Sequence, residues 1–316
     1  MPNHTILLGD CIEGMKTLPD GCVHTCITSP PYFGLRSYDG GEKEIGQEAT
    51  VDSYVAKMVD VFREVKRILR DDGTLWLNLG DSYMSATCVP PPQTVANGCN
   101  RGMPTDFIPA NRQKQNGLKQ KDLIGIPWRV AFALQADGWY LRQDIIWHKP
   151  NPMPESVEDR CTKAHEYIFM LTKKPRYYYD HEAIKEEAVG KPHAPGNKNV
   201  TQPKEKGARD PGLEPDRVWA SDGKRNKRSV WSVTTRSFKG AHFATFPKDL
   251  ITPCVLAGCP ADGTVFDPFT GSGTTAVVAL NHGRNFIGTE LNPEYVKLAE
   301  GRIADEVVQT LEGIME

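Results

Sequence analysis

The chain has 316 residues, of which 39% are hydrophobic, and its 38 basic and 40 acidic residues give a formal net charge of −2. This length can bury a large core, and we expect one main domain with a smaller insertion. The near-neutral charge excludes binding of a polyanion through a globally basic surface, so such binding needs a local patch. Neither a membrane-crossing apolar run nor a secretion signal is recognisable, which favours a reducing cytoplasm.

The predicted elements alternate between strands and helices. A strand is expected at residues 23–27 and an amphipathic helix at residues 51–69, which has apolar residues at helical spacing. Further strands are expected at residues 74–79, 139–147, 166–172, 263–266 and 285–289, and further helices at residues 128–136 and 274–280. Alternation of this kind indicates an α/β fold with a mainly parallel sheet.

Two stretches interrupt this alternation. Residues 84–122 are rich in Pro, Gln, Asn and Gly, and we expect a long mobile loop there. Residues 185–240 are polar and basic, with Trp219 and Trp231 on either side of the densest charge run. That run contains Lys224, Arg225, Lys227 and Arg228. A charge run is most often a solvated face, but the flanking tryptophans favour contact with nucleic acid.

The eight cysteines show no tight metal-binding spacing. Cys22 and Cys26, like Cys254 and Cys259, lack nearby paired histidines at zinc-finger intervals. We interpret them as reduced core residues and expect no metal.

The tetrapeptide Ser29-Pro30-Pro31-Tyr32 follows the first predicted strand. Consecutive prolines cannot continue a central strand, so the chain must leave the sheet in a stiff turn, and ligands of open α/β sheets bind at such strand ends. The Ser29 hydroxyl and a nearby carbonyl can accept both hydrogens of an amino group, while Tyr32 can stack on a planar ring. An ordinary Pro-Pro turn with a packed tyrosine explains the same residues equally well.

A glycine-rich turn, Gly271-Ser272-Gly273, separates the predicted strand at 263–266 from a helix. Such glycines let the backbone approach a ligand closely at a helix N-terminus. Glu290 follows about 20 residues later, where a carboxylate typically binds ribose hydroxyls. These features predict a site for a nucleotide-like cofactor. Too little chain follows Glu290 to complete a dinucleotide domain, so strands from the N-terminal part must finish the sheet.

With the Pro-Pro turn first and the cofactor turn last, the chain resembles the amino-group DNA methyltransferases of the permuted class known as β. The resemblance covers nearly the whole sequence. It implies a Rossmann-like methyltransferase fold with a mixed, mostly parallel sheet, circularly permuted motif order and an inserted target-recognition region. It also implies S-adenosyl-L-methionine as cofactor and double-stranded DNA as substrate.

The resemblance assigns roles residue by residue. The catalytic turn is matched by Ser29, Pro30, Pro31 and Tyr32, and residues 144–156 contain the segments that flank the base pocket. The cofactor site is matched by Asp10, Cys11, Phe246, Pro247, Asp267, Pro268, Phe269, Gly271, Ser272, Gly273, Thr274, Thr275, Glu290 and Leu291. Within it, Asp10 lies in the adenine-contacting segment, and Glu290 is the ribose clamp. We assign DNA binding to Lys224, Arg225, Lys227 and Arg228.

The same resemblance divides the chain into three parts. Residues 1–183 are the catalytic half, residues 184–240 the target-recognition region and residues 241–316 the S-adenosylmethionine-binding half. The mobile loop at about 84–122 belongs to the first part.

Serine at position 29 is usual in this family for cytosine-N4 enzymes, whereas aspartate or asparagine is usual for adenine-N6 enzymes. The resemblance therefore implies a site-specific cytosine-N4 DNA methyltransferase that flips its target base and transfers the methyl group in line. An adenine-N6 enzyme, a catalytically silent DNA-binding module and an RNA or small-molecule methyltransferase stay open as alternatives. A bacterial or phage protein in the cytoplasm, associated with the nucleoid through DNA, is expected. A cognate restriction endonuclease and a homodimer are left open.

Three further residues have competing interpretations. Cys254 follows a proline, like the nucleophile of cytosine-C5 methyltransferases, but its place before the cofactor strand favours a helix core residue. His148 closes a strand and is interpreted as structural rather than as a general base. Asp81 can either line the pocket or cap a helix.

Overall fold

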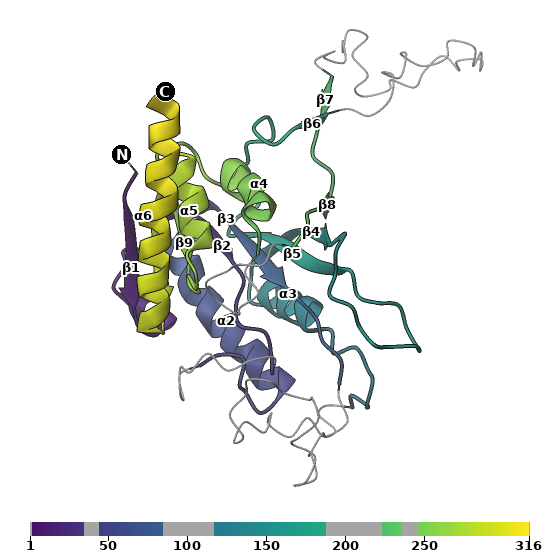
Figure 1. Cartoon of the computed structure of the whole chain (residues 1–316). Coiled ribbons are helices and arrows are strands. Elements are labelled where there is room, and N and C mark those ends of the chain that lie inside the picture. The colour runs from purple at the N-terminus through teal and green to yellow at the C-terminus, as the bar shows by residue number, and fades with distance from the viewer. Residues whose placement is uncertain (1, 35–43, 85–116, 188–222, 236–245, 316) are drawn as a thin grey trace, which may run out of the picture.

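The structure is a computed structural model that describes residues 2–34, 44–84, 117–187, 223–235 and 246–315 (Figure 1). Within these residues the main feature is an eight-stranded sheet with the order β1-β10-β9-β2-β3-β5-β4-β8. Most of the expected mobile loop, at residues 85–116, and residues 188–222 of the target-recognition region, with Trp219, lie outside the described residues.

The sheet combines strands from both ends of the chain. Its strands are β1 (His4–Leu8), β2 (Val23–Thr28), β3 (Leu69–Leu79), β4 (Tyr140–His148), β5 (His165–Thr172), β8 (Val230–Ser232), β9 (Thr264–Asp267) and β10 (Asn285–Glu290). Strand β5 is antiparallel to β3 and β4, and the other pairs in this sheet are parallel. The mixed, mostly parallel sheet is confirmed. So is the expectation that N-terminal strands complete the C-terminal half, because β1 pairs with β10 and β2 with β9.

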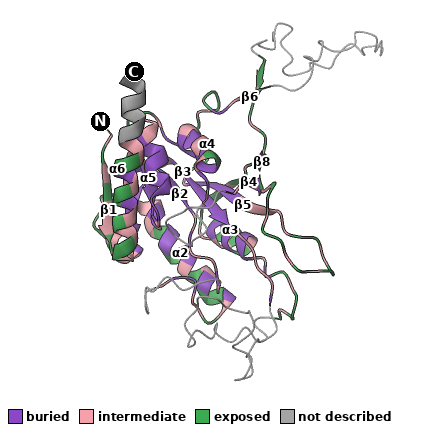
Figure 2. Cartoon of the chain, in the orientation of Figure 1, coloured by how far each residue is buried: buried purple, intermediate pink, exposed green. Residues whose placement is uncertain are grey.

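Helices cover both faces of the sheet (Figure 1). One face packs against α1 (Cys11–Lys16), α2 (Val51–Ile68) and α3 (Ile126–Ala136), and the other against α4 (Lys248–Gly258), α5 (Thr274–Asn281) and α6 (Pro293–Met315). Alternate residues of one strand serve both faces: Leu75 and Leu77 join the first apolar cluster and Trp76 the second. Figure 2 shows the buried residues concentrated in the sheet and on the inner sides of these helices.

The boundary between α2 and β3 differs from the prediction. Helix α2 begins at Val51, as predicted, after a capping box formed by Thr50 and Ser53. It ends at Ile68, and the polar residues 71–73, which were expected to separate helix from strand, lie within β3. The pairing of β3 with β2 shifts there, so several residues of β3 face one residue of β2. A bulge of this kind accommodates polar residues without ending the strand.

The predicted target-recognition region contributes a strand to the edge of the main sheet near its C-terminal end. Its strand β8 pairs with β4, and Trp147 lies opposite Trp231 in that pairing. A two-stranded antiparallel ribbon, β6 (Glu186–Glu187) with β7 (Lys224–Arg225), lies beyond β8 (Figure 1). None of the helices in the described ranges combines the length and apolarity needed to cross a bilayer.

Candidate active site

Both predicted motifs lie where the strand order reverses. From β9 the chain passes through α5 to β10 on one side, whereas from β2 it passes through α2 to β3 on the other. Ligands of open α/β sheets bind at the carboxyl ends of the strands at such a switch point. Ser29 directly follows β2, and the glycine turn follows β9. The two motifs, more than half the chain apart in sequence, therefore share one edge of the sheet.

The carboxylate of Asp267 joins these two motifs. Asp267 is 2% exposed, and its carboxylate accepts hydrogen bonds from Thr28 Oγ1 at 2.6 Å and Thr275 Oγ1 at 2.7 Å. It also accepts one from the Phe269 backbone N–H at 3.0 Å. Burial raises the pKa of Asp267 to about 6, although all of these donors favour the ionised form. The carboxylate expected in the cofactor site thus holds the end of β2, the loop after β9 and helix α5 in one arrangement.

Glu290 holds the glycine turn. Its Oε2 accepts a hydrogen bond from the Gly271 N–H at 2.8 Å, and its Oε1 accepts one from the Asn292 N–H at 2.9 Å. Burial raises the pKa of Glu290. Each carboxylate oxygen can accept more than one hydrogen bond, so this arrangement leaves acceptor capacity for a ribose hydroxyl.

The two glycines of the turn serve different purposes. Gly271 has a φ of +50°, and a Cβ there would have only the Phe269 carbonyl oxygen, at 3.9 Å, within 4 Å. The turn is therefore open beside Gly271, as close approach of a ligand requires. Gly273 has a φ of +76° and faces helix α6, where a Cβ would lie 3.0 Å from that of Ala299. Together the turn and the Glu290 carboxylate suit a nucleotide-like cofactor.

The N-terminal segment, which is predicted to contact the adenine of the cofactor, runs beside Glu290. The Gly9 N–H donates to the Glu290 carbonyl at 2.8 Å, as an extension of the β1–β10 pairing. The Asp10 side chain caps α1 by accepting hydrogen bonds from the N–H groups of Ile12 and Glu13, at 2.9 and 3.0 Å. Cys11 is buried, and burial raises the pKa of its thiol to about 12, so this cysteine is a packing residue.

The remaining predicted cofactor residues take part in helix capping, packing or backbone contacts. Pro247 is the N-cap of α4, and Phe246 packs against the second apolar cluster. The Pro268 carbonyl accepts a hydrogen bond from Thr289 Oγ1 at 2.6 Å. Leu291 follows the last residue of β10.

Arg302 of α6 supports the turn and was not predicted. Its Nη1 donates to Thr274 Oγ1 at 2.8 Å and to the Ser272 carbonyl at 3.2 Å. A helical arginine has no sequence signal that would distinguish this contact from an ordinary surface ion pair.

The Ser-Pro-Pro-Tyr turn, predicted to be catalytic, is held by a polar cluster. The Tyr32 hydroxyl lies 2.8 Å from Glu166 Oε2 and 3.4 Å from Asn78 Oδ1. Lys149 forms an ion pair with Glu166 and lies over the Trp147 ring. Burial and the Glu166 charge raise the pKa of Tyr32 well above its usual value, so its hydroxyl stays protonated.

The turn is also fixed by close packing. The Pro31 carbonyl accepts a hydrogen bond from the Tyr54 hydroxyl of α2 at 2.9 Å. Gly80 lies against the Tyr32 ring, because a Cβ at Gly80 would come within 2.6 Å of it. The Pro-Pro turn thus keeps its shape through contacts with two neighbouring elements.

Glu166 was predicted only as the first residue of a strand. The one signal that could have drawn attention to it is a charged residue at the head of the apolar run that forms β5. Because β5 is antiparallel to its neighbours, its first residues, rather than its last, lie at the edge that carries the two motifs.

The three residues with competing interpretations have structural roles. Asp81 Oδ1 accepts hydrogen bonds from the N–H groups of Gly125 and Ile126, at 3.0 and 3.1 Å, and so caps helix α3. His148 Nδ1 lies 3.0 Å from Ser232 Oγ and links β4 to β8. Cys254 is fully buried in α4, and burial raises the pKa of its thiol.

The other described cysteines are free thiols that differ in burial, and Cys161 is exposed rather than part of the core. Cys26 and Cys259 are buried in the core, and Cys22 is partly buried. In the described ranges, no cluster of three or more His, Cys, Asp and Glu side chains could hold a metal ion.

The basic run is partly neutralised by the protein itself. Glu186 Oε1 pairs with Arg225 Nε at 2.9 Å and with Arg228 Nε at 2.7 Å. Trp231, which favoured a DNA contact in the sequence, is only 6% exposed, and its indole N–H donates to the Arg228 carbonyl. Lys227 Nζ lies 5.0 Å from the centroid of the Trp231 ring. Trp231 is therefore a packing residue of the sheet edge rather than an exposed aromatic platform.

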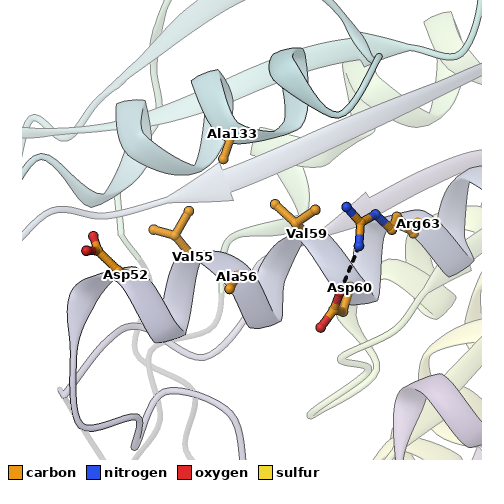
Figure 3. Close-up of a pocket in the computed structure, with 7 residues that line it drawn as sticks. All are labelled: Asp52, Val55, Ala56, Val59, Asp60, Arg63 and Ala133. Atoms are coloured by element: carbon orange, nitrogen blue, oxygen red, sulfur yellow. Dashed lines mark hydrogen bonds and ion pairs between the residues drawn. The ribbon is translucent and has the colours of Figure 1, made fainter.

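A separate hollow of about 300 Å³ lies between α2 and α3 (Figure 3). Its lining residues are Asp52, Val55, Ala56, Val59, Asp60, Arg63 and Ala133. It contains none of the residues of the two motifs, so it is not the candidate active site.

Comparisons with known proteins identify the family. The model of the DNA methylase family, which covers N6 and N4 methyltransferases, matches residues 23–301. The chain belongs to this family. S-adenosyl-L-methionine is the methyl donor of the family and the cofactor of this chain, which is a DNA methyltransferase.

Individual relatives match over most of their length. The chain is 45% identical to the Type II methyltransferase M.Cfr9I of Citrobacter freundii, covering 96% of this chain and 88% of that protein. It is 46% identical to M.SmaI of Serratia marcescens, covering 94% and 90%. Among solved structures, the PvuII DNA methyltransferase (cytosine-N4-specific) has a TM-score of 0.61 at 20% identity, covering 98% of this chain and 93% of that one. The complex of M1.HpyAVI with S-adenosylmethionine has a TM-score of 0.53 at 17% identity, covering 95% and 98%. These structures support the Rossmann-like methyltransferase fold.

The raised pKa of Asp267 predicts a pH dependence of stability. Folding raises this pKa from an ordinary value of 3.8 to about 6, so between these values the folded protein binds more protons than the unfolded protein. The contribution of Asp267 to the free energy of unfolding must therefore fall as pH rises. The free energy of unfolding of the wild type minus that of Asp267→Asn should fall by about 2 kcal/mol between pH 4.5 and pH 7, measured by urea denaturation.

Asp71→Asn is a control that should stay nearly flat in this pH range. Hydrogen bonds from Lys174 and Lys173 lower the pKa of Asp71 from its ordinary value of 3.8, so the stabilisation that it provides is lost only as pH falls below that value. A difference between wild type and Asp267→Asn that stays flat, or grows with pH, would contradict the raised pKa of Asp267.

Proposed function

We propose that this protein is a site-specific, Type II DNA methyltransferase that methylates the exocyclic N4 amine of cytosine in duplex DNA. The observation that carries the proposal is Ser29, the first residue of the Ser-Pro-Pro-Tyr turn, one residue beyond Thr28, whose hydroxyl is bonded to Asp267 beside the cofactor turn. The names of the relatives M.Cfr9I and M.SmaI support the Type II assignment. The cytosine-N4 specificity in the name of the PvuII enzyme agrees with a serine at this position.

The chemistry requires the protein chiefly to align the two reacting groups and to polarise the target amine. S-adenosylmethionine supplies a methyl group on a sulfonium, which is already strongly electrophilic. The cytosine amine is a poor nucleophile because its lone pair is delocalised into the ring. Hydrogen bonds from this amine to the Ser29 hydroxyl and the Pro30 carbonyl help to localise the lone pair. Alignment of the two groups for in-line displacement can lower the barrier by about 7 kcal/mol or more when the reactants are well oriented. No covalent intermediate with the enzyme is required.

The target amine must leave the duplex to reach this turn. Extrusion of a base costs a few kcal/mol, least where the base is already poorly paired. Tyr32 is partly buried, and its aromatic ring is the group proposed to stack on the extruded base. Such stacking offsets part of the cost of extrusion.

The first test concerns Ser29 and the product. Ser29→Ala should slow methyl transfer while affinity for S-adenosylmethionine and the melting temperature persist, because the missing acceptor faces the target amine rather than the cofactor. Mass spectrometry of nucleosides from DNA methylated by the purified wild type should show N4-methylcytosine. A product that is N6-methyladenine alone would identify the chain as an adenine enzyme and overturn the assignment based on Ser29.

We also propose where the cofactor lies. The segment at Asp10, the turn from Asp267 to Thr275 and the Glu290 carboxylate would enclose the nucleoside and methionine parts of S-adenosylmethionine. The openness beside Gly271 and the acceptor capacity left on Glu290 support this placement.

A calorimetric measurement tests the placement. Glu290→Ala should weaken S-adenosylmethionine binding by about tenfold to a hundredfold, because hydrogen bonds to a charged group contribute about 1.5–3 kcal/mol each. Glu300→Ala removes an exposed carboxylate of α6, paired with His4, and is the matched control that should bind normally. Equal affinity of wild type and Glu290→Ala would show that the ribose is bound elsewhere.

Contact with DNA is assigned to residues 184–240, through Lys224, Arg225, Lys227 and Arg228, and to the loop near residues 84–122. Local basic charge on a nearly neutral chain supports this assignment. Glu186 pairs with both arginines of the run, Arg225 and Arg228. These ion pairs fix the positions of the two guanidinium groups and offset part of their positive charge.

The salt dependence of DNA binding tests this assignment. Replacing the four basic residues with alanine should weaken binding and reduce the slope of log K against log salt by about 0.9 for each phosphate that the protein no longer neutralises. Cofactor affinity should persist. The double variant Lys16→Ala with Lys297→Ala is the control. It removes two exposed lysines, from helices α1 and α6, and should leave the slope unchanged. An unaltered slope in the fourfold variant would reject the basic run as a DNA-binding surface.

The assignment has consequences for partners and location. The Type II methyltransferase names of the relatives support a cognate restriction endonuclease as a proposed partner, and the bacterial relatives favour the cytoplasm of a bacterium, or of one infected by a phage. A catalytically silent module would need neither Ser29 nor Glu290, and the presence of both supports an active enzyme.

A further inference from the structure

We propose that Arg302 and Glu306 of helix α6 are positioning residues for S-adenosylmethionine, which hold the glycine turn in its ligand-binding shape and tie it to the segment before α4. This inference rests on the proposed placement of the cofactor at that turn. Gly271 and Gly273 leave the turn with few preferences of its own, because glycine populates positive and negative φ about equally. A contact from outside the turn must therefore select one shape.

Arg302 contacts the turn from its buried side. Its Nη1 donates to the Thr274 hydroxyl at 2.8 Å and to the carbonyl and hydroxyl oxygens of Ser272, each at 3.2 Å. Ser272 and Thr274 are 6% and 5% exposed, whereas the turn is open beside Gly271. The peptide unit is planar, so fixing the Ser272 carbonyl also fixes the orientation of the Gly273 N–H. Arg302 can therefore set the shape of the turn without touching a ligand.

Packing of α6 against the turn keeps Arg302 within reach. Ala299 is fully buried, and a Cβ at Gly273 would lie 3.0 Å from the Ala299 Cβ. Ala299 and Arg302 are three residues apart on α6, so both lie on the face that meets the turn. One turn of α6 thus supplies both the close packing and the hydrogen bonds.

Glu306 fixes Arg302 and extends the network to α4. Its Oε1 accepts a hydrogen bond from Arg302 Nε at 2.5 Å, and its Oε2 accepts one from Lys248 Nζ at 2.5 Å. The side chains of Arg302 and Glu306 are 10% and 27% exposed. Burial opposes ionisation of Glu306, but the hydrogen bonds from Lys248 and Arg302 outweigh it and lower the pKa of Glu306, so this carboxylate is charged at neutral pH.

The far end of the network lies beside a second part of the predicted cofactor site. Lys248 is the first residue of α4 and directly follows Phe246 and Pro247, which are both predicted to belong to that site. One carboxylate thus joins the start of α4 to the turn after β9. An arginine suits this junction, because its planar guanidinium donates in several fixed directions at once.

A turn that is already held in one shape needs no ordering when the cofactor binds. If the turn samples other shapes, the apparent affinity falls with the fraction of molecules in the binding shape. Loss of the network should therefore weaken cofactor binding. Once the cofactor is bound, its own contacts hold the turn, so the rate of methyl transfer at saturating cofactor should persist.

Calorimetry with S-adenosylmethionine and the full chain tests the network. Arg302→Met keeps the length of the side chain without its donors, Arg302→Lys keeps the charge without the fork, and Glu306→Gln keeps an acceptor without the charge. Arg302→Met should weaken binding by about tenfold, and the other two variants by less. Single-turnover methyl transfer to unmethylated chromosomal DNA at saturating cofactor should stay within about twofold of the wild-type rate.

Arg67→Met is the matched control. Arg67 of α2 likewise pairs through Nε with a carboxylate of its own helix, that of Glu64, and its Nη1 and Nη2 donate to the carbonyls of Leu18 and Met15, at 3.0 and 2.7 Å. These contacts join the end of α2 to the end of α1, and none of them involves the glycine turn. Arg67→Met should lower the melting temperature, as Arg302→Met does, and leave the affinity for S-adenosylmethionine unchanged.

Double variants test whether the other residues act through Arg302. Arg302→Met with Glu306→Gln should bind no more weakly than Arg302→Met alone, because residues of one network are not additive. Lys248→Met should weaken binding in the wild type and have no further effect in Arg302→Met. Losses that multiply would show independent contributions and overturn the network.

These measurements separate the network from the cofactor placement on which it rests. Wild-type affinity of Arg302→Met overturns the network, and weak binding by Glu290→Ala in the same assay then leaves the placement intact. Wild-type affinity of both variants would mean that the cofactor lies elsewhere. An equal loss of affinity in Arg67→Met would reflect general destabilisation and would also overturn the network. Should Arg302→Met not fold, Arg302→Lys and its double variant with Glu306→Gln are judged by the same criteria.

Discussion

The buried carboxylate of Asp267 joins halves of the chain that lie 239 residues apart at the Thr28 contact. Burying a charge is costly unless donors surround it, and here donors come from β2, from the loop after β9 and from α5. Thr28 immediately precedes Ser29, so the turn proposed to bind the target amine and the turn proposed to bind the cofactor both contact this carboxylate. A displacement of Asp267 would move both turns and, under the proposed function, change the distance between methyl donor and acceptor, to which in-line transfer is sensitive.

Much of the fold could be predicted because its signals are local. The apolar runs of β2 and β9, the glycine turn before α5 and the acid that ends β10 each lie within a few neighbouring residues. The start of α2 was also predicted correctly from the helical spacing of its apolar residues, and in the structure a capping box fixes it. Only its boundary with β3 was misplaced, because a bulge inside a strand and a turn between two elements use the same polar residues and glycine.

The features that the sequence did not reveal are pairings across long distances. Glu166 reaches Tyr32 only because β5 reverses direction between two parallel strands, and no short turn motif announced that reversal. Arg302 reaches the cofactor turn from the last helix. Glu186 pairs with Arg225 across a ribbon whose strands lie 39 residues apart in sequence. Each side chain is unremarkable in its local context, and its role follows from which neighbour the topology supplies.

The pairing of β1 with β10 also governs when the protein can be completed. Asn3 bonds to a residue 282 positions later, and β1 has no other neighbour in the described sheet. At ordinary rates of synthesis, roughly 15–60 s separate the appearance of these two strands. During that interval the edge of β1 and the inner side of β2 lack partners, and contacts of such long range form late and slowly. The order of the strands in the chain thus delays completion of the sheet, because β1 and β2 cannot form these pairings until β9 and β10 have been synthesised.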